Sequence, residues 1–171
     1  MTIRTLTFFL LAAGLLHAGP SLIFLSPGNS LTGLPGETVF WNIRVTNDAD
    51  YMFITQLDYQ TLVPVGTFTD LFSGTAPMLG PGESADGSGQ YVIDPAVPPG
   101  YISQGSLVVT YDLYSLDISD PDFDPGADLI VSNATLSAFA QVTVTPEPAT
   151  MWMALAGAGL AALGAWRRIR A

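Results

Sequence analysis

The sequence predicts an all-β domain, an antiparallel sandwich, over residues 19–145. Several segments in this part alternate apolar and polar residues with the two-residue period of a half-buried strand. Clusters of Gly, Pro, Asn and Asp separate these segments at intervals of about eight to twelve residues, as in small all-β domains. No window of this part carries the 3.6-residue apolar stripe of an amphipathic helix.

The chain begins with the plan of a secretory signal peptide. Residues 1–18 contain one early positive charge at Arg4 and an apolar run over residues 6–16, and small residues follow at Ala18 and Gly19. The apolar run is too short to span a membrane permanently. We therefore expect residues 1–18 to be removed by signal peptidase; the alternative is a buried N-terminal helix.

Residues 38–46 give the clearest strand, because Val39, Trp41, Ile43 and Val45 share one face. Residues 51–59 are predicted to be its hairpin partner. Trp41 is expected to fill the space between the two sheets, and stacking against a sugar at the surface is the alternative. Further strands are predicted at residues 22–25, 61–65, 67–72, 90–93, 107–113 and 134–144. Turns or breaks are predicted at residues 34–36, 47–50, 80–83, 86–89 and 95–100.

The fold class is therefore all-β: an antiparallel immunoglobulin-like β-sandwich, flanked by an N-terminal signal-peptide helix and a C-terminal transmembrane helix. Three parts follow from this reading. Residues 1–18 are the signal peptide, residues 19–145 are the sandwich, and residues 146–171 are a tail. No cysteine is present, so the sandwich is expected to be held together by packing without disulfides.

The sandwich is strongly acidic. The formal charge of the chain is −10, but four of its five basic residues lie in the two end segments, which leaves Arg44 alone between residues 19 and 145. All fifteen acidic residues except Glu147 lie in the same part, so its net charge is −13. Such a charge repels nucleic acid and anionic membrane surfaces and favours divalent cations or basic partners.

The residues available for chemistry are few. The one histidine is His17, inside the predicted signal peptide, and the chain has no lysine and no cysteine. Catalytic triads, thiol nucleophiles, Schiff bases and imidazole metal sites are therefore excluded from residues 19–145. Paired carboxylates remain, so a carboxylate-based glycoside hydrolase is an alternative to the non-enzymatic role that we expect.

An aspartate-rich segment is the candidate metal site. Asp120, Asp122 and Asp124 alternate, and Asp128 follows. Carboxylates at alternate positions are typical of the first half of a calcium loop. The EF-hand pattern then fails, because Pro125 occupies its sixth position and Val131 its twelfth. A calcium site between strands and a solvated acidic loop both stay open, and no other cofactor is expected.

The last segment has three parts in a fixed order. Pro146, Glu147 and Pro148 form a stiff break that cannot continue a sheet. Residues 149–166 are uncharged and, as a helix of roughly 27 Å, just short of a hydrocarbon core of about 30 Å. The third part is a basic end with Arg167, Arg168 and Arg170. These arginines are expected to keep the C-terminus in the cytoplasm, which places the residues before 146 outside the cell membrane.

This order resembles the PEP-CTERM sorting signal of exported Gram-negative bacterial proteins. The resemblance covers residues 146–171 and the general plan of the chain. It implies that Pro146, Glu147 and Pro148 are recognised by an exosortase, a membrane enzyme of bacteria that make exopolysaccharide, and that the three arginines stop translocation. An ordinary C-terminal membrane anchor is the alternative.

The chain is thus expected to be a non-enzymatic protein of the cell envelope, outer surface or extracellular matrix, held in the inner membrane before processing. Exopolysaccharide or other matrix components are the expected surroundings and partners. A calcium-dependent or glycan-binding adhesion module of the same architecture is the second hypothesis.

Overall fold

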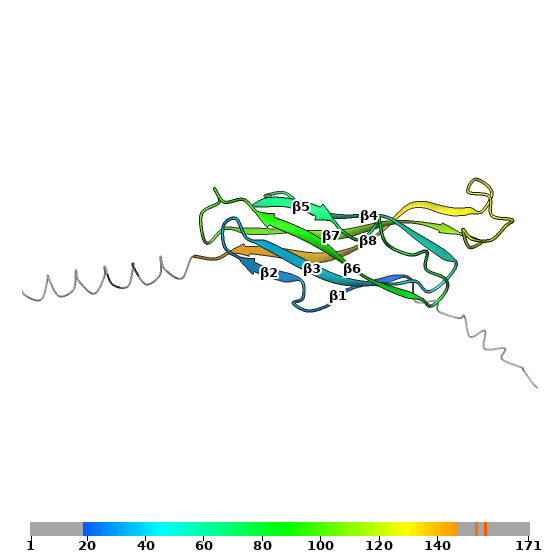
Figure 1. The fold of residues 1–171 in the computed structure, drawn as a ribbon, viewed down its shortest axis with the longest axis horizontal. Helices are drawn as coiled ribbons and strands as arrows, with labels where there is room; N and C mark the ends of the chain where they lie inside the picture. The colour runs from blue at the N-terminus through cyan, green and yellow to red at the C-terminus, as the bar shows by residue number, and fades with distance from the viewer. Residues whose placement is uncertain (1–18, 147–152, 154–155, 157–171) are drawn as a thin grey trace, which may run out of the picture.

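The computed structural model describes residues 19–146, Met153 and Ala156. Eight strands form two four-stranded sheets that pack face to face (Figure 1). The sheets have the strand orders β1-β3-β6-β5 and β2-β8-β7-β4. The strands are β1 (Ser21–Phe24), β2 (Ser30–Gly33), β3 (Thr38–Thr46), β4 (Tyr51–Thr61), β5 (Gly66–Asp70), β6 (Ser84–Ile93), β7 (Ile102–Tyr114) and β8 (Leu129–Val144). The all-β prediction is confirmed, and the predicted signal peptide lies outside the described residues.

Trp41 lies at the centre of the space between the sheets and is fully buried. Its ring centroid lies 4.8 Å from that of Tyr59, 6.3 Å from that of Phe68 and 5.9 Å from that of Tyr91. These rings come from β4, β5 and β6, so Trp41 of β3 joins both sheets. The predicted packing role is confirmed, and a buried indole excludes sugar stacking at this residue.

The predicted hairpin between residues 38–46 and 51–59 is wrong. β3 pairs with β1 and β6, whereas β4 pairs with β7 in the other sheet. The connection turns a corner at Asn47, whose buried amide donates to the carbonyl oxygens of Asp50, Leu79 and Gly80. Both strands bury an apolar face, and placing them in opposite sheets lets the two faces cover each other.

The break predicted at residues 86–89 is also wrong, because this segment lies inside β6. Its glycines make room for aromatic rings. A Cβ atom at Gly87 would lie 2.1 Å from Cδ2 of Phe72, and one at Gly89 would lie 2.5 Å from Cε2 of Phe68. Glycine here permits close packing against a strand and does not mark a turn.

The other predicted strands coincide with observed strands whose ends differ, except residues 61–65. There β4 ends at Thr61, and a turn leads to β5. The sequence pattern missed β2, which has only four residues and pairs parallel to the end of β8. The sheet that contains β2 is therefore mixed, and the antiparallel prediction holds for the other strand pairs of the described residues.

Asp70 connects the two sheets at the end of β5. Its carboxylate accepts hydrogen bonds from the backbone N–H of Leu57 in β4 and from Phe72 and Ser73 in the following loop. Burial raises the pKa of Asp70, but these bonds and one from the Ser73 hydroxyl lower the pKa more, so it lies below its ordinary value.

We expect Asp70→Asn to lower the free energy of unfolding by about 1 to 2 kcal/mol at neutral pH, because an amide cannot accept all of these bonds. A carboxylate with a lowered folded-state pKa stabilises the fold above its unfolded pKa of about 3.9, and this stabilisation is lost as the pH falls through the folded value. Urea unfolding at several pH values should therefore show a shallower acid loss in the variant. Asp58→Asn on β4 is the control, and an equal effect there would contradict this role.

Candidate functional site

The candidate site is the junction between β8 and the C-terminal tail. Val144, the last residue of β8, is buried, and its N–H donates to the carbonyl of Tyr101 over 2.9 Å. Thr145 donates from its N–H and its hydroxyl to the carbonyl of Gly33, over 2.8 and 3.1 Å. Pro146 follows at once and is exposed. The folded domain therefore ends one residue before the predicted sorting residues, without a linker.

Most of the predicted tail lies outside the described residues, including Glu147, Pro148, Arg167, Arg168 and Arg170. Of the predicted helix, Met153 and Ala156 are described, and both are helical and exposed. Within the described residues, no helix combines the length and the apolar character that crossing a membrane requires.

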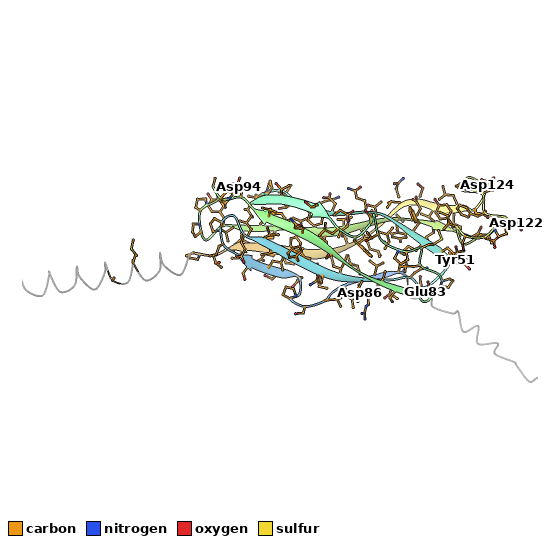
Figure 2. All side chains as sticks on the ribbon, in the orientation of Figure 1. Tyr51, Glu83, Asp86, Asp94, Asp122 and Asp124 are labelled. Atoms are coloured by element: carbon orange, nitrogen blue, oxygen red, sulfur yellow. The ribbon has the colours of Figure 1, made fainter. Side chains whose placement is uncertain are left out.

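The aspartate-rich loop lies at the end of the domain opposite Pro146. It joins β7 to β8, and Asp122 and Asp124 lie at the projecting tip (Figures 1 and 2). The ring of Phe123 packs against Tyr114, with centroids 5.3 Å apart. The candidate metal residues and Pro146 thus lie beyond opposite ends of β8.

The carboxylates of this loop accept hydrogen bonds mostly from backbone N–H groups of the same loop. Asp120 accepts from the N–H of Asp122, and Asp124 accepts from that of Gly126. Asp128 accepts from the N–H of Asp124 and the hydroxyl of Ser115, and these bonds lower the pKa of Asp128. Within the described residues, no group of three acidic or histidine side chains is arranged to hold a metal ion. Calcium binding stays a prediction, which a calcium titration followed by the melting temperature would test.

Among the hollows of the described surface are two shallow ones that no carboxylate lines. One lies between β2 and β3 and is lined by apolar and neutral polar residues, among them Leu31, Phe40 and Asn42. The other lies over β4 and β7 and is lined by Gln60, Gln104 and their neighbours.

Sequence reasoning missed the structural roles of Asn47 and Asp70. Both residues lie in or beside segments with turn-forming composition, and both are held by several hydrogen bonds that join the sheets. The turn chemistry of Asn and Asp is visible in a sequence. The partners of these side chains are distant in the chain, and no local pattern indicates them.

Comparison with known families supports the sequence reading of the tail. Residues 144–169 match the PEP-CTERM protein-sorting motif. The chain therefore carries a PEP-CTERM motif, which implies export and a membrane-anchored sorting signal. The match begins at Val144, so the motif and the last strand of the domain overlap. No curated protein sequence matches the chain.

Solved structures show only distant likeness. A family 123 glycoside hydrolase from Clostridium perfringens has 13% identity and a TM-score of 0.42, and the match covers 74% of this chain and 27% of that one. The VesB protease of Vibrio cholerae has 17% identity and a TM-score of 0.37, with 75% and 32% covered. The chain thus spans about a third or less of these two proteins. At these TM-scores the likeness assigns neither a fold family nor an activity.

Proposed function

We propose that this chain is a non-enzymatic exported protein, sorted through its C-terminal tail and processed by an exosortase. The observation that carries the proposal is the sorting motif at residues 144–169, attached directly to the end of β8. After processing, the domain resides in the cell envelope, at the outer surface or in the extracellular matrix.

The junction supports this order of events. The last backbone bond of the domain is made by Thr145, and Pro146 has no N–H with which to extend the pairing. The arginines at the end of the tail keep the C-terminus in the cytoplasm, and the domain then lies against the outer face of the inner membrane until the tail is cut. Pro146 is exposed directly after the last bonded residue of the domain, so the start of the motif is accessible to a membrane enzyme.

We infer that the domain has the immunoglobulin-like topology. If β1 and β3 to β8 are named A to G and β2 is named A′, the sheets read ABED and A′GFC. Immunoglobulin domains of the constant type place ABED in one sheet and CFG in the other. The buried Trp41 packs between the sheets, although the chain lacks the disulfide of antibody domains. Domains of this architecture serve many unrelated functions, so the fold assigns none here.

The composition of the domain supports a non-enzymatic role. Residues 19–145 contain no histidine, cysteine or lysine, so imidazole bases, thiol nucleophiles and Schiff-base lysines are missing from the sequence itself. The proposed matrix setting makes exopolysaccharide the expected neighbour of the mature protein, with exosortase and signal peptidase as processing partners.

The intact mass of the protein isolated from its producing cells tests this proposal. We expect a mass that lacks residues 1–18 and also lacks the apolar helix with its arginines. A mature protein that retains the tail up to Ala171 would contradict exosortase processing and would favour a permanent membrane anchor.

A further inference from the structure

The exit end of the domain is the end at which β8 finishes and Pro146 follows (Figure 1). The register brings other strand ends to the same place, because Gly33 of β2 and Ile102 of β7 lie opposite the last two residues of β8. The exit end is therefore built from the connections β2 to β3, β4 to β5 and β6 to β7, which are residues 34–37, 62–65 and 94–101.

Hydrogen bonds connect the end of β8 with the loop that follows β4. The N–H of Val144 donates to the carbonyl of Tyr101 over 2.9 Å. Two residues further along, the hydroxyl oxygens of Ser103 and Thr61 lie 3.0 Å apart, and the N–H of Val63 donates to Oγ1 of Thr61 over 3.3 Å. The loop after β4 is thus held beside the start of β7, which pairs with the end of β8.

Large apolar side chains are exposed on these two connections. Leu62 is 99% exposed and Val63 is 55% exposed, while the values for Tyr101 and Ile102 are 51% and 47%. No charged residue occurs in the two segments that carry them, residues 59–69 and 95–111. Single exposed apolar residues are ordinary on a protein surface, whereas several gathered on neighbouring loops indicate an interaction surface.

The carboxylates are concentrated at the opposite end of the domain. Of the fourteen in residues 19–145, nine lie there, in residues 47–50, at Glu83 and in residues 112–128. Figure 2 shows Asp122 and Asp124 at that end and Asp94 at the exit end. The domain is therefore polarised along its length, and the exit end is the end that a membrane surface repels least.

Two carboxylates do lie at the exit end, those of Glu37 and Asp94. Glu37 precedes β3 and Asp94 follows β6, so both border the sheet that does not contain β8. They accept hydrogen bonds from the N–H groups of Leu34 and Ala96, over 2.6 and 2.8 Å. The β8 side of the exit end, as far as the structure describes it, thus carries exposed apolar residues and no carboxylate.

We propose that the exit end docks on the membrane surface while the tail anchors the chain. Four side chains enter the boundary between headgroups and acyl chains: Leu62, Val63, Tyr101 and Ile102. Tyrosine is enriched at this depth of a membrane, and insertion removes apolar surface from water. The inference rests on the proposed stage in which the sorting tail holds the domain at the membrane.

The length of chain after the domain makes the membrane the occupant of this surface. The uncharged run of the sorting motif begins at residue 149, and three residues beyond Pro146 span at most about 11 Å. The exit end therefore stays close to the membrane surface for as long as the tail is anchored. Docking then holds Pro146 at the level of the headgroups and turns the acidic end toward the solvent.

Fluorophores on single cysteines test the docking, because the native sequence has no cysteine. The chain without its predicted signal peptide, residues 19–171, is reconstituted in phosphatidylcholine vesicles with and without brominated acyl chains. We expect a label at Leu62→Cys to shift to the blue and to lose about half or more of its fluorescence to bromine, since interfacial side chains reach about 5–10 Å into this boundary. The matched control is Ile118→Cys, which is 54% exposed in the far loop and should show neither effect.

The outcomes separate docking from anchoring. Equal spectra at the two labelled positions, in a chain that floats with the vesicles, would overturn the docking and leave the anchored tail intact. A blue shift at Leu62→Cys without quenching by bromine would indicate contact with protein, such as a second copy, and would also overturn it. A chain that does not float with the vesicles would contradict the membrane anchor itself and the docking with it.

A charged substitution tests the same surface from a second position. In a chain labelled at Tyr101→Cys, we expect Leu62→Asp to reduce the quenching by about half or more, because a carboxylate must lose its water to enter the boundary. Leu62 is almost fully exposed, so the substitution leaves the fold intact, and the melting temperature checks this. Ile118→Asp is the control and should leave the quenching at Tyr101→Cys unchanged. Equal quenching in the two aspartate variants would overturn the proposal.

Discussion

Replacing Trp41 by alanine is expected to lower the free energy of unfolding by about 3 to 5 kcal/mol. The indole is fully buried and lies within 6.3 Å, between ring centroids, of Tyr59, Phe68 and Tyr91. Its Nε1–H also donates to the carbonyl of Asn29, which precedes β2. The substitution leaves a large cavity between the sheets, and urea unfolding of the purified protein measures the loss.

The neighbouring residue provides the control for this prediction. Phe40 lies on the other face of β3 and is 42% exposed. Phe40→Ala should therefore lower the free energy of unfolding by only about 1 kcal/mol. Similar losses in the two variants would show that Trp41 is not the centre of the core.

Replacing Pro146, Glu147 and Pro148 together by alanine is expected to abolish maturation in the native host while leaving the domain folded. Pro146 is exposed. The last hydrogen bonds that hold the end of β8 in the domain are made by the preceding residue, Thr145, so the fold does not depend on Pro146. The intact mass and the membrane fraction of the variant measure the effect. We expect the variant to retain its tail and to stay with the inner membrane.

Thr145→Ala is the matched control, one residue before the motif's first proline. It removes one hydroxyl bond to the carbonyl of Gly33 and leaves the three sorting residues intact. We expect this control to be processed like the native chain. Normal processing of the triple variant would count against recognition of these residues by an exosortase, and equal melting temperatures would exclude misfolding as the cause of any failure.

The strands that the sequence predicts best are those with one buried and one polar face. In β3 the buried residues Trp41, Ile43 and Val45 follow the expected two-residue period. The sorting motif was equally predictable, because its break, apolar run and arginines depend on local composition alone and match the family model. The choice of sheet partner was not predictable in the same way, as the hairpin assigned to β3 and β4 demonstrates.

The roles of particular residues also depend on contacts that the sequence does not show. Gly87 and Gly89 indicate a turn by composition, but their places are decided by the rings of Phe72 and Phe68. In the sequence, Asp70 does not differ from the other acidic residues. Its structural role comes from the hydrogen bond that its carboxylate accepts from the N–H of Leu57, which is distant in the chain. Contacts of this kind depend on how two sheets close over each other, which no window of a sequence contains.

The sequence by itself determined that this chain is an all-β domain followed by a PEP-CTERM motif, which implies export, because periodicity and composition report local backbone preference and membrane affinity. Only the tertiary structure decided which strands share a sheet and that β2 pairs parallel with the end of β8. The physical reason is that strand pairing is a non-local choice. An edge is open or closed according to where distant segments come to lie, and the same alternating pattern is compatible with either.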